Sequence, residues 1–421
     1  MTDASRPSRA RQLTLLTGLY AAQGLPFGFF TLALPVLLRE AGWSLTQISL
    51  LQFLALPWAI KFLWAPLVDH HGTRRAWLLG LQCAAIALAL LLSQLGLALG
   101  SLALFAAVFA FNLVAATQDV VTDGLAVRLL DARERGLANG IQVGAYRLGM
   151  ILGGGLLLWV FARSSWAVMF LGMAALLALT TLPVLRLREP PRTVKAAAAA
   201  GATLPASRGG WRLALSWLDR IRAPGMLAVA GLIFCYRFGD QMVSGLIVPF
   251  VSDQGVGKET IALMKGAVGS ATSLLGAALG GWFTFKVGRR QALLASGLAQ
   301  AAGFGLYIAA ALDVGGIGLL WVATVVEGIV STMASVALFA LMMDAADPDH
   351  AGTDYTLLAS VVVAVSSLGG LAGAVVGDAL GYAAAFGTGT VLAALGCMAM
   401  VWWLDRHPTH ERVAKAWWRA G

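Results

Sequence analysis

The sequence predicts an all-α protein that crosses a membrane about twelve times, and three observations support this prediction. Of its 421 residues, 59% are hydrophobic and only 12% are charged, whereas a soluble domain carries about 25% charged residues. Long apolar runs recur along the chain, each near the roughly 20 residues that a spanning helix needs. Because only a helix satisfies its own backbone hydrogen bonds in lipid, we expect each run to be helical.

The apolar runs form two groups of six, separated by a polar linker. They fall at 13–38, 46–68, 76–98, 101–127, 138–161, 166–185, 226–251, 261–284, 290–311, 315–343, 355–378 and 382–404. The linker contains adjacent prolines, a run of alanines and many basic residues, which is typical of a tether. The predicted domains are an N-terminal six-helix half (1–185), a cytoplasmic linker (186–225) and a C-terminal six-helix half with a short basic tail (226–421). Within the linker, we expect Trp211–Arg222 to lie as a helix on the membrane surface.

The 30 Lys and Arg residues predict the orientation of the spans. Positive residues concentrate in cytoplasmic loops. If the N-terminus is inside, the outside loops hold only Arg39, Arg163, Lys258 and Lys265. This asymmetry predicts that both termini are cytoplasmic. The loop between the tenth and eleventh runs is an exception, because it holds acidic residues and no Lys or Arg.

A weak internal repeat relates the two halves. Asp69-His-His-Gly-Thr-Arg-Arg75 follows the second run, and Phe285-Lys-Val-Gly-Arg-Arg290 follows the eighth, in the matching loop. Two unrelated basic turns would also give this pattern. Together with twelve runs and a central linker, however, the repeat predicts the major facilitator architecture, in which two six-helix halves are related by parallel repeats.

Seven charged residues lie inside the predicted spans, where each costs about 2.5–3.5 kcal/mol on insertion scales. They are Lys61, Asp119, Asp123, Arg147, Arg237, Asp240 and Glu327. Asp119 and Asp123 share a helical face, and Arg237 and Asp240 are close enough to pair within one helix. Structural salt bridges are one explanation for these charges. A substrate or proton pathway is the other, and it is favoured because intramembrane ionisable residues are functional by default.

These residues give a specific site prediction. Cationic and polar side chains are expected to hold anionic substrate groups, namely Lys61, Arg147, Arg237, Tyr146, Tyr236, Gln23 and Gln118. Desolvated carboxylates can titrate near neutral pH, so Asp119, Asp240 and Glu327 are expected to carry a coupled proton. The residues nearer the cytoplasmic ends are expected to gate, namely Asp69, Arg74, Arg75 and Asp123.

A kink is expected in the first span at Pro26, which lies between Gly24 and Gly28. Such a kink would present Gln23 and Tyr20 to a ligand. A simple packing kink is the alternative.

Other functional classes lack their sequence signatures. There is no Gly-x-x-x-x-Gly-Lys-Ser/Thr loop, so no ATP site or ATPase subunit is implied. The histidines and the three cysteines show no zinc or disulfide spacing, so no cofactor, metal ion or catalytic residue is expected. Membrane topology explains the net charge of +9 without nucleic acid. A membrane-bound acyl-transfer enzyme is the remote alternative, although no nucleophile–base pair is visible. The expected partners are the bilayer and a small-molecule substrate, with a monomer as the default state.

Several segments carry a family resemblance. They are Gln-Gly-Leu-Pro-Phe-Gly (23–28), Lys-Phe-Leu-Trp-Ala-Pro-Leu-Val-Asp (61–69), Gln-Asp-Val-Val-Thr-Asp (118–123), Glu-Arg-Gly (134–136), Tyr-Arg-Leu-Gly-Met (146–150) and Tyr-Arg-Phe-Gly-Asp (236–240). In these segments the chain resembles the AmpG-like group of major facilitators, which includes muropeptide permeases, acetyl-CoA transporters and siderophore permeases of the RhtX/FptX type. The resemblance implies a bacterial inner-membrane permease that imports a bulky anionic solute by alternating access, coupled to protons.

The substrate has two candidates within this resemblance. The Tyr-Ala-Ala-Gln-Gly-Leu-Pro-Phe-Gly-Phe-Phe segment that begins at Tyr20 looks more like the siderophore branch. Long muropeptide permeases also often carry two further C-terminal spans. The resemblance therefore favours a ferric siderophore, with an anhydromuropeptide of cell-wall recycling as the alternative. Both solutes carry anionic groups, so the charges of the chain do not separate them.

Overall fold

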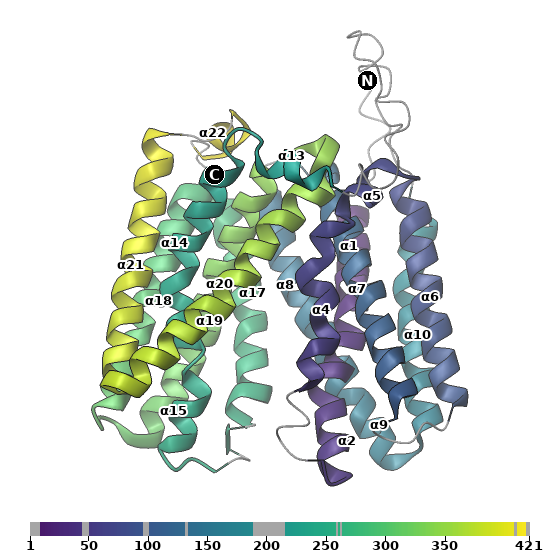
Figure 1. Cartoon of the computed structure of the whole chain (residues 1–421), viewed down its shortest axis with the longest axis horizontal. Coiled ribbons are helices and arrows are strands. Elements are labelled where there is room, and N and C mark those ends of the chain that lie inside the picture. Colours follow the sequence, from purple (N-terminus) through teal and green to yellow (C-terminus); the bar gives the residue numbers. More distant parts are fainter. Residues whose placement is uncertain are drawn as a thin grey trace. The chain divides into compact units, whose positions relative to one another are not determined.

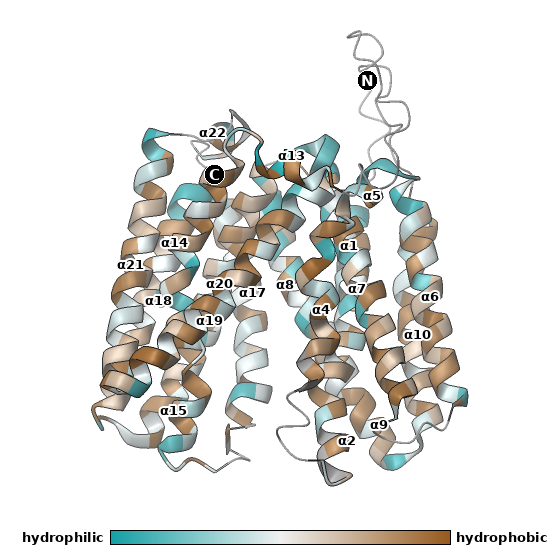
Figure 2. Ribbon diagram, in the orientation of Figure 1, coloured by the Kyte–Doolittle hydropathy of each residue, from teal (hydrophilic) through white to brown (hydrophobic). Residues whose placement is uncertain are grey.

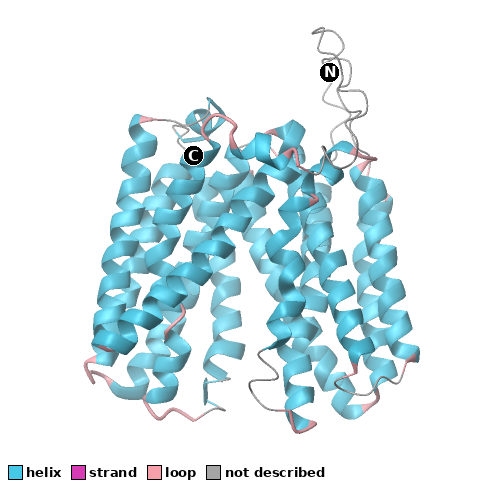
Figure 3. Cartoon of the chain, in the orientation of Figure 1, coloured by secondary structure: helices cyan, strands magenta, loops and turns pink. Residues whose placement is uncertain are grey.

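The computed structural model describes residues 9–43, 50–95, 101–130, 134–187, 215–257, 260–261, 263–407 and 411–417. In these ranges the regular secondary structure is helical throughout (Figure 3). Ten helices in the described ranges are long and apolar enough to cross a membrane. Hydrophobic residues cover their lengths, and hydrophilic residues gather towards the helix ends (Figure 2). The all-α membrane fold is thereby confirmed, while the number twelve stays a prediction.

The chain forms two compact units. Unit 1 comprises Met1–Leu125, Gly149–Ile221 and Asp347–Thr356, and unit 2 comprises Ala126–Leu148, Arg222–Ala346 and Leu357–Gly421. These units differ from the predicted halves, because each contains one segment from the other half of the sequence. The division of the sequence into halves stays a prediction. The structural finding is that Ala126–Leu148 and Asp347–Thr356 each pack within the unit built mostly from the other half of the sequence.

Unit 1 is built from the helices of the first six predicted spans, with short segments between them (Figure 1). Its elements are α1 (Arg9–Gly28), η2 (Phe29–Ala33), α2 (Leu34–Glu40), η3 (Leu50–Ala55), α4 (Leu56–Ile60), η4 (Lys61–Leu63), α5 (Ala65–His70), α6 (Arg74–Gln94), α7 (Leu102–Leu129), η5 (Leu152–Leu156), α9 (Leu157–Arg163), α10 (Trp166–Leu185), α13 (Trp217–Ile221) and η7 (Pro348–His350). The helix α8 (Arg135–Ile151) begins in unit 2 and ends in unit 1.

The second predicted span is divided into short helices, and its prolines explain why. Pro57 and Pro66 each lie in the first turn of a new helix, α4 and α5. Proline is tolerated there because its missing N–H would have no partner in the helix anyway. The single 3₁₀ turn η4 lies between these two helices and carries Lys61. In the first span, Pro26 stays inside α1, and the irregularity is the π-helical segment η2 that follows.

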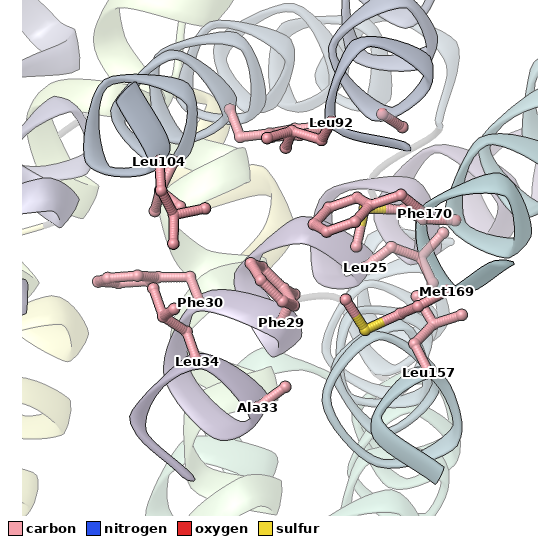
Figure 4. Close-up of a cluster of buried hydrophobic side chains, with 14 of the residues drawn as sticks. Leu25, Phe29, Phe30, Ala33, Leu34, Leu92, Leu104, Leu157, Met169 and Phe170 are labelled. Atoms are coloured by element: carbon pink, nitrogen blue, oxygen red, sulfur yellow. The ribbon is translucent and has the colours of Figure 1, made fainter. Parts of the chain in front are cut away.

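An apolar core holds unit 1 together beyond Pro26. Phe29 and Phe30 of η2 lie among Leu92, Leu104 and Phe170 from three other helices (Figure 4). The rings of Phe29 and Phe170 meet edge to face, with their centroids 5.1 Å apart. Edge-to-face packing of this kind adds to the contact energy of two aromatic side chains. The polar residues of α1 lie before this core, on the segment that faces α7.

Unit 2 contains the helices of the later predicted spans (Figure 1). They are α14 (Met226–Ser244), α15 (Ile247–Asp253), η6 (Leu263–Val268), α17 (Gly269–Val287), α18 (Arg289–Ala311), α19 (Gly316–Ala345), α20 (Ala351–Leu380), α21 (Tyr382–Arg406) and α22 (Glu411–Trp417). The first residues of α20 belong to unit 1. Small residues bring these helices close together: a Cβ on Gly276 would lie 2.5 Å from the carbonyl oxygen of Ile329 on α19. Such close approach is how helices associate in lipid.

The predicted linker is described only in part. Residues 188–214 lie outside the described ranges, and they include the beginning of the predicted surface helix at Trp211. The helix that is described, α13, spans Trp217–Ile221. Trp217 packs edge to face against Phe62 of the second span, with the ring centroids 5.1 Å apart. This helix is therefore fixed to the protein, and its placement on the membrane surface stays a prediction.

Candidate functional site

A buried ion pair in unit 1 links η4 to α7. The Nζ atom of Lys61 contacts a carboxylate oxygen of Asp119, and the two side chains are 7% and 11% exposed. The same Nζ atom lies 5.4 Å from the ring centroid of Trp58, so the cation also faces an aromatic ring. Two buried charges that pair in this way compensate each other's loss of hydration. The predicted substrate ligand Lys61 and the predicted proton carrier Asp119 thus contact each other.

A hydrogen-bonded seam joins α1 to α7 beside this pair. The hydroxyl of Tyr20 donates to Asp123 at 2.9 Å, Gln23 donates to the hydroxyl of Thr122 at 3.1 Å, and Gln118 donates to the carbonyl of Leu19 at 3.3 Å. Gln23 and Gln118 are 1% and 3% exposed, so these predicted substrate ligands lie inside the helix packing. The Oε1 atom of Gln23 is buried and accepts no hydrogen bond in the described structure. It is the open acceptor of the seam.

In unit 2, Arg237 and Asp240 pair as their spacing predicts. Their closest N–O distance is 2.6 Å, and the side chains are 12% and 2% exposed. Asp240 also accepts hydrogen bonds from Gln241, Ser244 and Gln300. Arg237 reaches Ser335 on α19 at 3.4 Å. The cluster therefore ties α14 to α18 and α19 through polar groups inside the span.

The three other predicted substrate ligands of unit 2, Tyr236, Arg147 and Tyr146, lie outside the Arg237 cluster. Tyr236 is 3% exposed, and its hydroxyl donates to the backbone carbonyl of Leu293 at 3.4 Å. Its ring lies against Gly297, so it fills the packing between helices and is not part of the Arg237 cluster. A helix presents residues 100° apart in different directions, which is why adjacent positions have different roles. Arg147 is exposed on α8 and makes no ion pair in the described structure, and its neighbour Tyr146 is half-buried.

Glu327 has a partner that the sequence analysis placed in an outside loop. The Nζ atom of Lys265, on η6, lies 3.3 Å from Oε2 of Glu327 on α19. This Nζ atom also lies 6.0 Å from the ring centroid of Tyr307 on α18. Since η6 continues directly into α17, Lys265 belongs to a continuous helical segment and not to a loop. The predicted run beginning at 261 already contained it, and that boundary was the available signal.

Asp69 forms the centre of a buried hydrogen-bonded cluster in unit 1. It accepts hydrogen bonds from Arg74 at 2.8 Å, from the backbone N–H groups of Gly352 and Thr353 at 3.2 and 2.7 Å, and from the hydroxyl of Thr353 at 2.8 Å. Arg75 instead donates to the carbonyl of Leu185 at 3.0 Å. Of the predicted gating residues, Asp69 and Arg74 therefore belong to one cluster, while Asp123 belongs to the seam with Tyr20.

A second buried cluster of charged residues, in unit 2, was missed by the sequence analysis. Asp344, at the end of α19, contacts Arg135 at 2.8 Å and Arg289 at 2.7 Å, and its side chain is fully buried. Arg289 belongs to the repeated Gly–Arg–Arg turn, so the sequence had already singled out this partner of Asp344. The signal for Asp344 was the acidic loop that breaks the positive-inside pattern.

Asp354 accounts for another acid of that loop. Arg220 of α13 donates to both its carboxylate oxygens, at 2.8 and 2.7 Å, and the backbone N–H of Asp347 donates to it at 2.9 Å. The Asp354 carboxylate raises the pKa of Arg220 above its ordinary value, because the hydrogen bond favours the charged guanidinium. Asp344, Asp347 and Asp354 are thus paired with arginines from elsewhere in the chain.

The described residues contain no group of three or more His, Cys, Asp and Glu side chains that could hold a metal ion. The three cysteines are free, with Cys397 buried.

Comparisons with known proteins give the chain its context. The family model of the Major Facilitator Superfamily matches residues 16–353 and 229–420. An uncharacterized protein of Haemophilus influenzae is 32% identical over 398 residues, which cover 90% of this chain and 91% of that protein. The anhydromuropeptide permease of Escherichia coli is 28% identical over 356 residues, 81% of this chain and 69% of the permease. The putative transporter AmpG 4 of Rickettsia felis is 23% identical over 356 residues, 80% and 83% of the two chains.

Solved structures show the same fold. The human organic anion transporter MFSD10 (TETRAN) superposes with a TM-score of 0.67 at 16% identity, covering 94% of this chain and 100% of that one. The transporter FucP in its outward conformation gives a TM-score of 0.67 at 15% identity, covering 94% and 98%. At these identities the likeness concerns the fold alone.

Proposed function

This chain belongs to the Major Facilitator Superfamily and is a multi-pass transporter of the bacterial inner membrane, and we propose that it imports an anhydromuropeptide or a closely similar sugar–peptide. The observation that carries the proposal is the match to the E. coli anhydromuropeptide permease over 81% of this chain. As a transporter of this superfamily, it is not an acyl-transfer enzyme.

The expected ferric siderophore gives way to its alternative, because the named relatives are anhydromuropeptide and AmpG-type permeases. The structure offers a physical reason why the first span carries little information about the solute. The residues from Tyr20 to Phe30 that favoured the siderophore branch are mostly buried, including Tyr20, Gln23, Phe29 and Phe30. Residues buried in helix packing report the fold, and they say little about the solute.

The charges inside the spans support an anionic solute. Lys61 in unit 1 and Arg237 in unit 2 are cations held within apolar helices, each beside one carboxylate. A charged side chain inside a membrane span is costly, and the charges that spans contain are usually functional. A sugar–peptide with free carboxylates gives each cation an alternative anionic partner during transport. Arg147, which is exposed and makes no ion pair in the described structure, is a further cation for this role.

Proton coupling follows from the same pairs. Asp119, Asp240 and Glu327 each neutralise one cation, so protonation of the carboxylate would release that cation for the solute. We assign gating to the Asp69 and Asp344 clusters. Each binds a helix end from the other half of the sequence, and rocking of repeats requires such contacts to break and re-form.

Uptake into proteoliposomes tests the proposal. Radiolabelled anhydromuropeptide should accumulate in vesicles that carry the purified protein and an inward proton gradient, and a protonophore should abolish accumulation. Lys61→Gln and Arg237→Gln should each reduce uptake by about tenfold or more, equivalent to about 1.4 kcal/mol of lost stabilisation. Lys286→Gln, an exposed lysine at the end of α17, is the matched control. Accumulation of a labelled ferric siderophore with no uptake of muropeptide would overturn the assignment.

A further inference from the structure

The ion pair between Lys265 and Glu327 differs from the other pairs inside the spans of unit 2. The two side chains are 27% and 18% exposed, whereas those of Arg237 and Asp240 are 12% and 2% exposed. Lys265 lies on the π-helical segment η6, and π-segments occur often at functional sites. The pair is therefore less enclosed by the protein than the pair of Arg237 and Asp240.

The ammonium group of Lys265 has unused hydrogen-bonding capacity. It carries three N–H donors. The described structure gives it one hydrogen bond, to Oε2 of Glu327, and a contact with the ring of Tyr307. By contrast, Asp240 has three further donors besides Arg237. Unlike the Arg237 pair, the Lys265 pair can thus add a ligand without first losing a network.

The charged surroundings of Glu327 are simple. Among the described residues, the titratable groups that face it are Lys265 from η6 and Tyr307 from α18. The other charged residues of α17 and α18 are Lys286, Arg289 and Arg290, all at the far ends of these helices. Arg237 of α14 reaches α19 at Ser335, about 12 Å along the helix from Glu327 at 1.5 Å per residue. Among the described residues, Lys265 is therefore the cation that pairs with Glu327.

We propose that Lys265 binds a carboxylate of the transported solute, and that Glu327 releases Lys265 for this purpose by taking up the coupled proton. The proposal rests on the proposed function and adds to it the place where proton and solute meet. One ammonium group faces two candidate anions. When Glu327 is ionised, it occupies Lys265 and repels a second carboxylate. When a proton from the aqueous side neutralises Glu327, the repulsion ends and Lys265 exchanges one carboxylate for the other.

Because of this competition, Lys265 binds the solute only when Glu327 carries a proton. Release on the other side follows by the reverse order: Glu327 loses its proton, re-forms the ion pair and displaces the solute. A purely structural pair would act differently, since it would only fasten η6 to α19 and its removal would affect all activities equally.

Two transport assays separate these alternatives. Glu327→Gln has no carboxylate to ionise, so it should retain exchange of labelled for unlabelled anhydromuropeptide across the membrane without a gradient. It should lose at least tenfold in accumulation driven by a pH gradient, and its half-saturation concentration for exchange should no longer vary with pH. Lys265→Gln should raise the half-saturation concentration at least tenfold in both assays, and Lys265→Arg should restore part of the loss. Lys286→Gln should behave as wild type.

Several results would overturn the inference. One is an unchanged half-saturation concentration in Lys265→Gln together with normal gradient-driven accumulation in Glu327→Gln. Another is equal loss of both activities in the two single variants, with recovery in the double variant Lys265→Gln/Glu327→Gln, which identifies a structural pair. If wild-type protein takes up no anhydromuropeptide in either assay, the proposed function fails instead.

The proposed protonation of Glu327 can also be tested without any solute, even if the protein takes up no anhydromuropeptide. Infrared difference spectra of the wild type should show a protonated carboxylic acid appearing as the pH falls, and Glu327→Gln should lack it. Identical spectra of the two proteins would overturn the proposal.

Discussion

Asp344 and Glu327 lie on the same helix, α19, yet their surroundings are opposite. Asp344 is fully buried at the helix end and contacts two guanidinium groups. Glu327 lies within the span, is 18% exposed and contacts one ammonium group. Asp69 resembles Asp344, since it accepts four hydrogen bonds and is 2% exposed. Burial and the number of donors thus distinguish Asp344 and Asp69 from Glu327.

The difference has a physical consequence. A buried carboxylate that satisfies several donors leaves each of them unpaired when it is lost, and unpaired buried charges are costly. A carboxylate with one donor and access to solvent can take up a proton or give way to another anion at smaller cost. We therefore expect the helix-end clusters to govern stability and gating, and the partly exposed pair of Lys265 and Glu327 to govern binding.

The largest effect is expected for Asp344→Asn. The substitution removes the charge that pairs with both Arg135 and Arg289, and breaking a buried pair in this way costs about 3–5 kcal/mol. Thermal unfolding of the purified protein in detergent should shift strongly downward, and folded yield should fall. Wild-type stability of this variant would show that donor number does not distinguish the two regions.

A smaller loss is expected for Thr353→Val, which keeps the side-chain shape and removes one hydroxyl. That hydroxyl donates to Asp69 at 2.8 Å, and a hydrogen bond to a charged group contributes about 1.5–3 kcal/mol. Because the backbone N–H of Thr353 still donates to Asp69, the cluster should weaken without being lost. Thermal unfolding measures the effect, with Thr353→Ser as the control that retains the hydroxyl.

Asp405→Asn repeats the Asp344 substitution at an exposed pair. Asp405 pairs with Arg290 at 2.8 Å, but the two side chains are 24% and 39% exposed. Exposed ion pairs contribute about 0.2–1 kcal/mol, and the N–H of Trp417 still has an oxygen to donate to. The unfolding temperature should change little. A loss as large as that of Asp344→Asn would mean that burial is unimportant here.

The smallest effect is expected for Tyr236→Phe. The lost hydrogen bond to the carbonyl of Leu293 is long, at 3.4 Å, and contributes about 0.5 kcal/mol. Since the ring still fills the helix packing, uptake of anhydromuropeptide should match the wild type. A tenfold loss of uptake would return Tyr236 to the substrate-binding group in which its position beside Arg237 had placed it.

Local patterns in the sequence were sufficient for the features that depend on short distances along the chain. Apolar length predicted the spanning helices, and Pro57 and Pro66 lie where the second span divides. The spacing of Arg237 and Asp240 predicted their pair. These features follow from helix geometry and from the cost of exposing backbone or charge to lipid, so neighbouring residues contain the necessary information.

Tertiary structure alone decided which distant charges meet. Asp344 pairs with Arg135, 209 positions earlier, and Thr353 donates to Asp69, 284 positions earlier. Lys265 reaches Glu327 from a helix that the charge pattern had treated as a loop. Such pairs depend on how whole helices pack, and no periodicity within one helix reports that. The apolar runs therefore determined that this protein spans a membrane. Helix packing decided which of its charged side chains are buried against several partners and which have one partner and remain partly exposed.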